Sequence, residues 1–260
     1  MFRILSLLVF LGIGWPLVAA PTSLVLLPPG GAKPTAHIVL LSGDEEYRGE
    51  ESLPMLAKIL SQRHGFKCTV LFALDADGTI NPDNQKSLPG SEALDSADLI
   101  VMALRFRAWP DEAMTRFTRA FQRGVPLVAL RTSTHAFNFP AGSPWSEYSW
   151  NRKDGRFPGG FGKAVLGETW VSHWGKHKFE ATRGVIEKAA GDHPVLRGVA
   201  DVFGDSDVYE AYPPADATIL LRGLVLKGMS PQDMPADTVK KRATDKVEQP
   251  VNSPAMPVAW

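Results

Sequence analysis

The sequence contains almost no cysteine and has no excess of either charge. Cys68 is the single thiol among 260 residues, so an internal disulfide framework is excluded. It lies in an apolar run, where a small core residue is the expected role. Basic and acidic side chains number 28 each, and no basic block stands out, so nothing predicts a nucleic-acid partner. The remaining composition, 44% hydrophobic and 22% charged, is that of a globular protein, either one α/β domain or two small ones.

The N-terminal segment is typical of a secretory signal peptide. Arg3 precedes an uncharged, mostly apolar stretch that ends in small residues, so we predict that residues 1–20 direct export to the periplasm or the extracellular space. Pro21 is unfavourable directly after a cleavage point, and an uncleaved segment would anchor the chain in a membrane. A Pro-Pro-Gly-Gly run then indicates a linker over 21–36, followed by a domain over 37–260.

Short apolar runs alternate with helical patterns through the first half of this domain. The predicted strands are 38–41, 67–74, 99–104 and 127–130. Apolar residues at helical spacing after Leu53, and a proline at position 110, predict helices between them. The pattern predicts a single α/β domain with a doubly wound, mostly parallel sheet and helices on both faces. Beyond Phe137 the periodicity fades, but 179–186 is predicted to be extended, 218–221 to form another strand, and 257–260 to begin one.

A candidate reaction centre follows the fourth predicted strand. The apolar run stops at Arg131, and small polar residues lead to His135. Ligands of open α/β sheets bind outside the carboxyl ends of the strands, which is where both residues are expected. The loop after the first strand adds three substrate-binding candidates: Asp44, Glu45 and Tyr47. The alternatives are a solvated loop with a surface histidine, and acidic residues that only favour the positive end of a helix.

Two later segments add further candidates. Trp145 and Tyr148 lie in a long aromatic loop, where they would either stack on a sugar or form a small satellite core. Tyr209 and Glu210 end an acidic and aromatic cluster, and they have either a binding and catalytic role or a structural one.

His173 and His177 invite a metal interpretation, since residues four apart on a helix share one face. Gly175 and the absence of an intervening glutamate argue against a helical metal motif here. A third ligand would have to be a distant histidine or carboxylate. We therefore predict no metal and no cofactor, with a site at these two histidines as the alternative.

Several motifs together resemble the ThuA-like (trehalose-utilisation) family. They are Gly-Asp-Glu-Glu-Tyr at 43–47, the turn from Arg131 to Phe137, Trp145-x-x-Tyr148, Gly-Gly-Phe at 159–161, Asp-His-Pro-Val-Leu at 192–196 and Asp207-x-Tyr209. The resemblance runs from His37 to the last residue. It implies membership of the class I glutamine amidotransferase-like superfamily, a flavodoxin-like sheet, and a role in the catabolism of disaccharides and their 3-keto derivatives.

The departures from the family pattern limit what it implies. The superfamily's amidotransferases place a nucleophilic cysteine in the turn where this chain has Thr132, Ser133 and Thr134, so glutamine amidotransferase chemistry is disfavoured. Many ThuA-like proteins carry histidine where this chain has Arg131, and the role of that histidine does not transfer. Family members also continue past the final Pro-x-Ala-Trp, so the resemblance implies a truncated C-terminus.

The chemistry implied by the resemblance starts with removal of a proton beside a ketone, followed by loss of a sugar. Such a reaction needs a base, a group that stabilises the developing enolate, and an acid. His135 is the predicted base, Arg131 the partner of the ketone oxygen, and Glu210 or His173 the acid. The sequence thus predicts an exported 3-keto-glycoside lyase or hydrolase with a small carbohydrate ligand. A non-catalytic carbohydrate-binding domain and a metal-dependent hydrolase are the alternatives, and the oligomeric state is left open.

Overall fold

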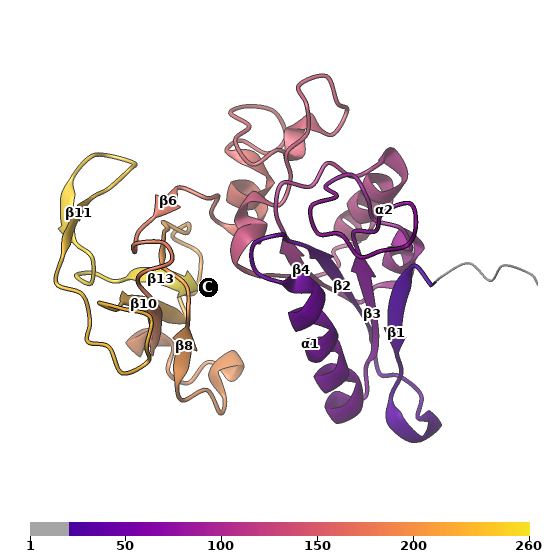
Figure 1. Ribbon diagram of the computed structural model, residues 1–260, viewed down its shortest axis with the longest axis horizontal. Coiled ribbons are helices and arrows are strands. Elements are labelled where there is room, and N and C mark those ends of the chain that lie inside the picture. The colour runs from indigo at the N-terminus through magenta and orange to yellow at the C-terminus, as the bar shows by residue number, and fades with distance from the viewer. Residues whose placement is uncertain (1–20) are drawn as a thin grey trace, which may run out of the picture.

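The computed structural model describes residues 21–260, and its first half is built on a five-stranded sheet (Figure 1). The strand order is β1 (Ser23–Leu26), β3 (Lys67–Phe72), β2 (His37–Gly43), β4 (Leu99–Leu104) and β5 (Leu127–Ala129). Strands β2 to β5 pair in parallel, and β1 runs antiparallel to β3. The four predicted strands are confirmed. The predicted signal peptide lies outside the described residues, and within 21–260 no helix is long and apolar enough to cross a membrane.

The predicted linker contributes a strand to the sheet. Strand β1 pairs with β3 from Ser23 opposite Leu71 to Leu26 opposite Cys68. The Ser61 hydroxyl also donates to the Leu27 carbonyl at 2.6 Å, which fixes the end of this strand to a helix. The prediction that 21–36 only connects was therefore wrong. An apolar Leu-Val-Leu run beside the open edge of β3 completes its ladder of hydrogen bonds.

One helix covers each face of this sheet. Helix α1 (Gly49–His64) packs Leu53 and Ala57 against the face that carries Ile38 and Leu40. Helix α2 (Asp111–Gln122) packs the opposite face, with Met114, Phe117 and Ala120 against Val39 and Leu41. All of β2 is buried, because alternate side chains enter different cores. Cys68 is a core residue as predicted, and burial raises the pKa of its thiol to about 11.

The aromatic segment after β5 belongs to the core on the α2 side. Tyr148, Phe157 and Phe161 pack edge-on or stacked against one another and against Phe137. Gly162 is needed for this arrangement, since a Cβ there would lie 1.9 Å from the carbonyl oxygen of Thr134. The segment is thus part of the main core on the α2 side and not a separate satellite core, and it supports the turn that carries His135.

The last third of the chain forms a second sheet, whose strands lie at or beside the extended segments predicted at 179–186, 218–221 and 257–260 but whose assembly the sequence did not predict. Its four antiparallel strands are ordered β13 (Met256–Ala259), β10 (Leu221–Val225), β7 (Thr182–Ile186) and β8 (Val202–Gly204). Two short ribbons flank it, β6 (Ser172–His173) with β9 (Tyr209–Glu210) and β11 (Val239–Lys241) with β12 (Glu248–Pro250). In Figure 1 the two sheets form separate lobes. We call residues 21–166 the N-terminal lobe and 172–260 the C-terminal lobe.

Candidate functional site

The loops at the carboxyl ends of β2 and β5 are tied together by Asp44. Its carboxylate accepts hydrogen bonds from the backbone nitrogens of Glu46 at 2.8 Å and Tyr47 at 3.3 Å, and from the Thr132 hydroxyl. Asp44 is buried, with 2% of its surface exposed. Asp44, which the sequence predicted to bind substrate, therefore holds in place the turn that carries Arg131 and His135.

Glu45 is also occupied by the protein itself. Its carboxylate pairs with Arg105 and, at 2.8 Å, with the fully buried Arg107. Arg107 donates further hydrogen bonds to the carbonyl oxygens of Arg105 at 2.6 Å and Pro82 at 2.8 Å. A Cβ at Gly43 would lie 2.9 Å from the Arg107 side chain, so only glycine fits beside it. The predicted role of Glu45 in binding sugar hydroxyls does not fit these contacts.

Arg131 joins the two lobes. Its guanidinium donates to the backbone oxygen of Asp207 at 2.7 Å and to its carboxylate at 3.0 Å. The same group lies between the rings of Tyr47 and Tyr209, 4.8 and 3.9 Å from their centroids. Arg131 also adopts a φ of 38°, a left-handed conformation that is uncommon for a residue with a side chain and often found at functional sites. Asp207 thus engages both terminal nitrogens of Arg131, while its buried Nε has no hydrogen-bond partner within residues 21–260.

Two histidines converge on the same aspartate. Nδ1 of His173 lies 2.9 Å from one carboxylate oxygen of Asp207, and Nδ1 of His177 lies 2.8 Å from the other. The two rings are 4.6 Å apart between centroids. Nε2 of His177 faces Glu46 at 3.2 Å, across the boundary between the lobes. We call His173, His177 and Asp207 the histidine cluster.

The histidine cluster shows which residues the sequence interpretation missed. Asp207 has no exposed side-chain surface and is the shared partner of both rings and of Arg131. In the sequence, Asp207 stands out only as part of the Asp-x-Tyr motif, and Glu46 only as part of the segment 43–47. As expected, the segment from His173 to His177 is not a helix. A turn brings the rings together instead.

His135 lies beside this cluster, in an aromatic environment. It is 3% exposed, and its ring centroid is 5.0 Å from Phe106, 6.1 Å from Trp170 and 6.3 Å from Tyr209. Trp170 and Tyr209 also contact His173. Burial lowers the pKa of His135 to about 3, and the positive charges of Arg105 and Arg131 act in the same direction. The ring is therefore neutral at physiological pH, unlike the freely titrating base that the sequence predicted.

This buried ring predicts a specific dependence of stability on pH. Folding lowers the pKa of His135, so the unfolded chain binds the proton more readily. The stability that the neutral ring supplies is complete above about pH 6.5, and it is lost as the pH falls toward about 3. Between about pH 7 and about pH 5 this costs about 2 kcal/mol of unfolding free energy. Urea unfolding at both pH values measures this loss. The unfolding free energy that is lost between the two pH values should be smaller by about 2 kcal/mol in His135→Gln than in the wild type. An equal loss in both proteins would contradict the assignment.

The other predicted candidates lie outside this group. Glu210 accepts hydrogen bonds from Ser172 at 2.7 Å, from Tyr212 at 2.8 Å and from the backbone nitrogen of Ala243 at 2.9 Å. Burial alone would raise the pKa of Glu210, but these hydrogen bonds outweigh it and the pKa is lowered. A general acid needs the opposite shift, so Glu210 fits a structural role.

The aromatic candidates are replaced by others. Tyr148 is buried in the core, where its hydroxyl meets Thr118 at 2.9 Å, and the indole of Trp145 donates to Asp111 at 2.8 Å. The rings next to His135 are instead Phe106 and Trp170, and both of these rings contact Trp150. Trp150 is the one member of the predicted aromatic loop that takes part. Tyr209 lies beside Arg131, and burial raises the pKa of its hydroxyl.

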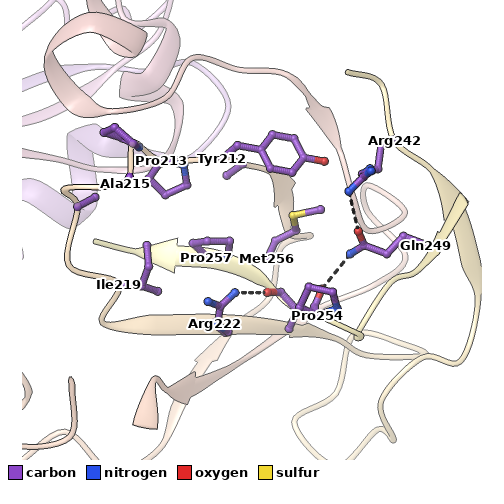
Figure 2. A pocket seen from close by; sticks show the side chains of 14 residues that line it. Tyr212, Pro213, Ala215, Ile219, Arg222, Arg242, Gln249, Pro254, Met256 and Pro257 are labelled. Atoms are coloured by element: carbon purple, nitrogen blue, oxygen red, sulfur yellow. Dashed lines mark hydrogen bonds between the residues drawn. The ribbon is translucent and has the colours of Figure 1, made fainter. Parts of the chain in front are cut away.

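A cavity of about 480 Å³ lies elsewhere, in the C-terminal lobe (Figure 2). Prolines, Tyr212 and Met256 line most of it. Its two arginines are already paired, Arg222 with Glu187 and the carbonyl of Ala255, and Arg242 with Asp245. The cavity therefore offers no free charged group, and the reactive side chains of the described residues gather at the histidine cluster instead.

Comparison with known proteins gives one likeness. No family model matches the chain, and no curated protein matches it. Among solved structures it is similar to a ThuA-like protein from Parabacteroides merdae ATCC 43184, at 17% identity and a TM-score of 0.45. The similarity covers 83% of this chain and 77% of that one. This TM-score is too low to establish the family.

Proposed function

We propose that the chain is a carbohydrate-processing enzyme of the ThuA-like type, which acts on 3-keto glycosides where the two lobes meet. The observation that carries the proposal is the gathering of His135 and the histidine cluster beside Trp170 and Tyr209. The neutral imidazole of His135 beside aromatic rings suits a sugar that must lose or gain protons. Export remains a prediction from residues 1–20.

The position of this group in the sheet supports the proposal. The parallel strands follow the order β3-β2-β4-β5, which corresponds to the first four strands of a flavodoxin-like sheet. In such sheets the ligand crevice lies between the two central strands whose connections run in opposite directions, here β2 and β4. Tyr47 follows β2, Arg105 and Phe106 follow β4, and His135 follows β5. A doubly wound, flavodoxin-like arrangement is accordingly part of the proposal.

His135 acts as the proton acceptor in this proposal. Its Nδ1 meets the Thr134 hydroxyl at 3.2 Å, and its Nε2 has no hydrogen-bond partner within residues 21–260. A ring with a pKa of about 3 always offers its lone pair at neutral pH, but it is a weak base. The group that meets the substrate's carbonyl oxygen must therefore supply much of the acceleration. Both terminal nitrogens of Arg131 are engaged by Asp207, so we assign this task to the histidine cluster.

Incubation with 3-keto-disaccharides tests the proposal directly. Purified protein should convert the keto sugars, followed by mass spectrometry, and leave the unoxidised sugars unchanged, because only a ketone makes the neighbouring proton removable. The matched control is His64→Gln, which removes an exposed imidazole at the far end of α1. Binding of the sugars without conversion would favour the alternative of a carbohydrate-binding domain. Conversion of the unoxidised sugars at the same rate would contradict the proton-abstraction chemistry.

A further inference from the structure

We infer that the histidine cluster is a binding site for a divalent transition-metal ion such as Zn²⁺. His173, His177 and Asp207 each offer one ligand atom, and these atoms lie within 4.8 Å of one another. The inference reverses the prediction that no metal binds. That prediction rested on a missing third ligand, and Asp207 supplies it from a segment 30 residues beyond His177.

The contacts of His177 suit a bound cation. Nδ1 lies 2.8 Å from Asp207 and Nε2 lies 3.2 Å from Glu46. A metal ion between Nδ1 and Asp207 leaves the single N–H group of a neutral ring free to donate to Glu46. The ring centroid of His173 lies 4.6 Å from that of His177, so one ion can accept the Nδ1 lone pairs of both rings.

The spacing of the atoms fits coordination. Two atoms bound to one ion at about 2.1 Å and at the tetrahedral angle lie about 3.4 Å apart. The distances from Asp207 to the two Nδ1 atoms are 2.9 and 2.8 Å, so an ion that replaces the shared protons needs only a small separation of these groups. Two imidazoles and a carboxylate without a thiolate favour zinc or iron, while magnesium and calcium prefer oxygen alone.

The protein holds these groups in place from several sides. The backbone nitrogens of Trp174 and Gly175 both donate to the Val208 carbonyl, at 2.7 and 3.1 Å, which turns the chain back on itself. A Cβ at Gly175 would lie 3.0 Å from the Cβ of Asp207, so glycine allows the turn to approach the aspartate. Arg131 orients the carboxylate. Outer contacts of this kind commonly fix the ligands of a metal site.

The histidine side chains leave room for a substrate or a water molecule. The side chains of His173 and His177 are 36% and 25% exposed, whereas Asp207 is fully buried. Catalytic metal sites keep such an open position, while structural sites are closed by protein ligands. A bound ion would polarise the carbonyl oxygen of a sugar beside His135, which is the electrophile that the proposed function needs. The inference deepens that function but is tested by binding alone.

The experiment uses the full chain after treatment with a chelator. We expect about one Zn²⁺ per chain by elemental analysis after excess ion is removed, and a rise in the unfolding temperature on adding Zn²⁺. His173→Gln combined with His177→Gln should weaken Zn²⁺ binding by more than about 100-fold, beyond the loss caused by removing an outer contact. His64→Gln should bind as the wild type does.

A spectroscopic measurement keeps the test decisive if the double variant does not fold. The wild type loaded with Co²⁺ should show the visible absorption of an ion bound by nitrogen and oxygen in a site with an open position. No stoichiometric Zn²⁺ in the wild type, or equal binding in the folded double variant, would overturn the inference. Turnover of 3-keto sugars by the chelated protein would leave the proposed function standing without the metal. A metal-loaded protein without turnover would support the metal site and contradict the proposed function.

Discussion

Replacement of His135 with glutamine is expected to lower the turnover of a 3-keto sugar by about 100- to 10,000-fold, the usual effect of losing a general base. Glutamine keeps a polar group of similar length but cannot accept the proton from carbon. The measurement is kcat and KM with a 3-keto-disaccharide, followed by mass spectrometry at about pH 7. The fall should appear in kcat, because His135 is proposed to act on the proton and not to anchor the sugar.

Stability measurements separate this role from a structural one. At about pH 7 the variant should unfold at a urea concentration close to that of the wild type, since the ring there carries no charge. His64→Gln is the control for removing an imidazole, and it should keep full activity. If His135→Gln keeps its kcat, or loses activity only in proportion to unfolding, His135 is not the base. The chain would then be better described as a binding domain on an α/β fold.

Replacement of Arg107 with methionine is expected to lower the free energy of unfolding by about 3 to 5 kcal/mol, as is usual when one partner of a buried ion pair is removed. Arg107 is fully buried, and it balances the charge of Glu45 and satisfies carbonyl oxygens of Pro82 and Arg105. Methionine fills most of the volume but leaves these groups without a donor. Urea unfolding followed by circular dichroism gives the difference.

An exposed arginine provides the matched control. Arg116 pairs with Glu112 at 3.1 Å and with Asp95 at the surface of α2. Ion pairs at the surface contribute about 0 to 1 kcal/mol, so Arg116→Met should change the free energy of unfolding by no more than that. If the two variants lose similar stability, the network around Glu45 does not hold the loop after β2 in place.

The sequence determined the parallel sheet and the position of His135. The runs at 38–41 and 99–104 are continuously apolar, and they became strands β2 and β4, which are buried between α1 and α2. A strand buried on both faces must be apolar throughout, so this pattern is local and can be recognised in one dimension. Arg131 closely follows β5, although β5 is an edge strand that is only partly buried, with Val128 45% exposed.

The tertiary structure alone decided what the side chains of the site do. Asp207 meets Arg131 across 76 residues and His173 across 34, and no local periodicity encodes such contacts. They turn Arg131 from an expected substrate partner into a link between the lobes. The assembly of the second sheet was likewise not predicted, because its short strands are only partly buried and lack long apolar runs. Burial also set the charge of His135, since a pKa depends on the surroundings that folding creates and not on the residue alone.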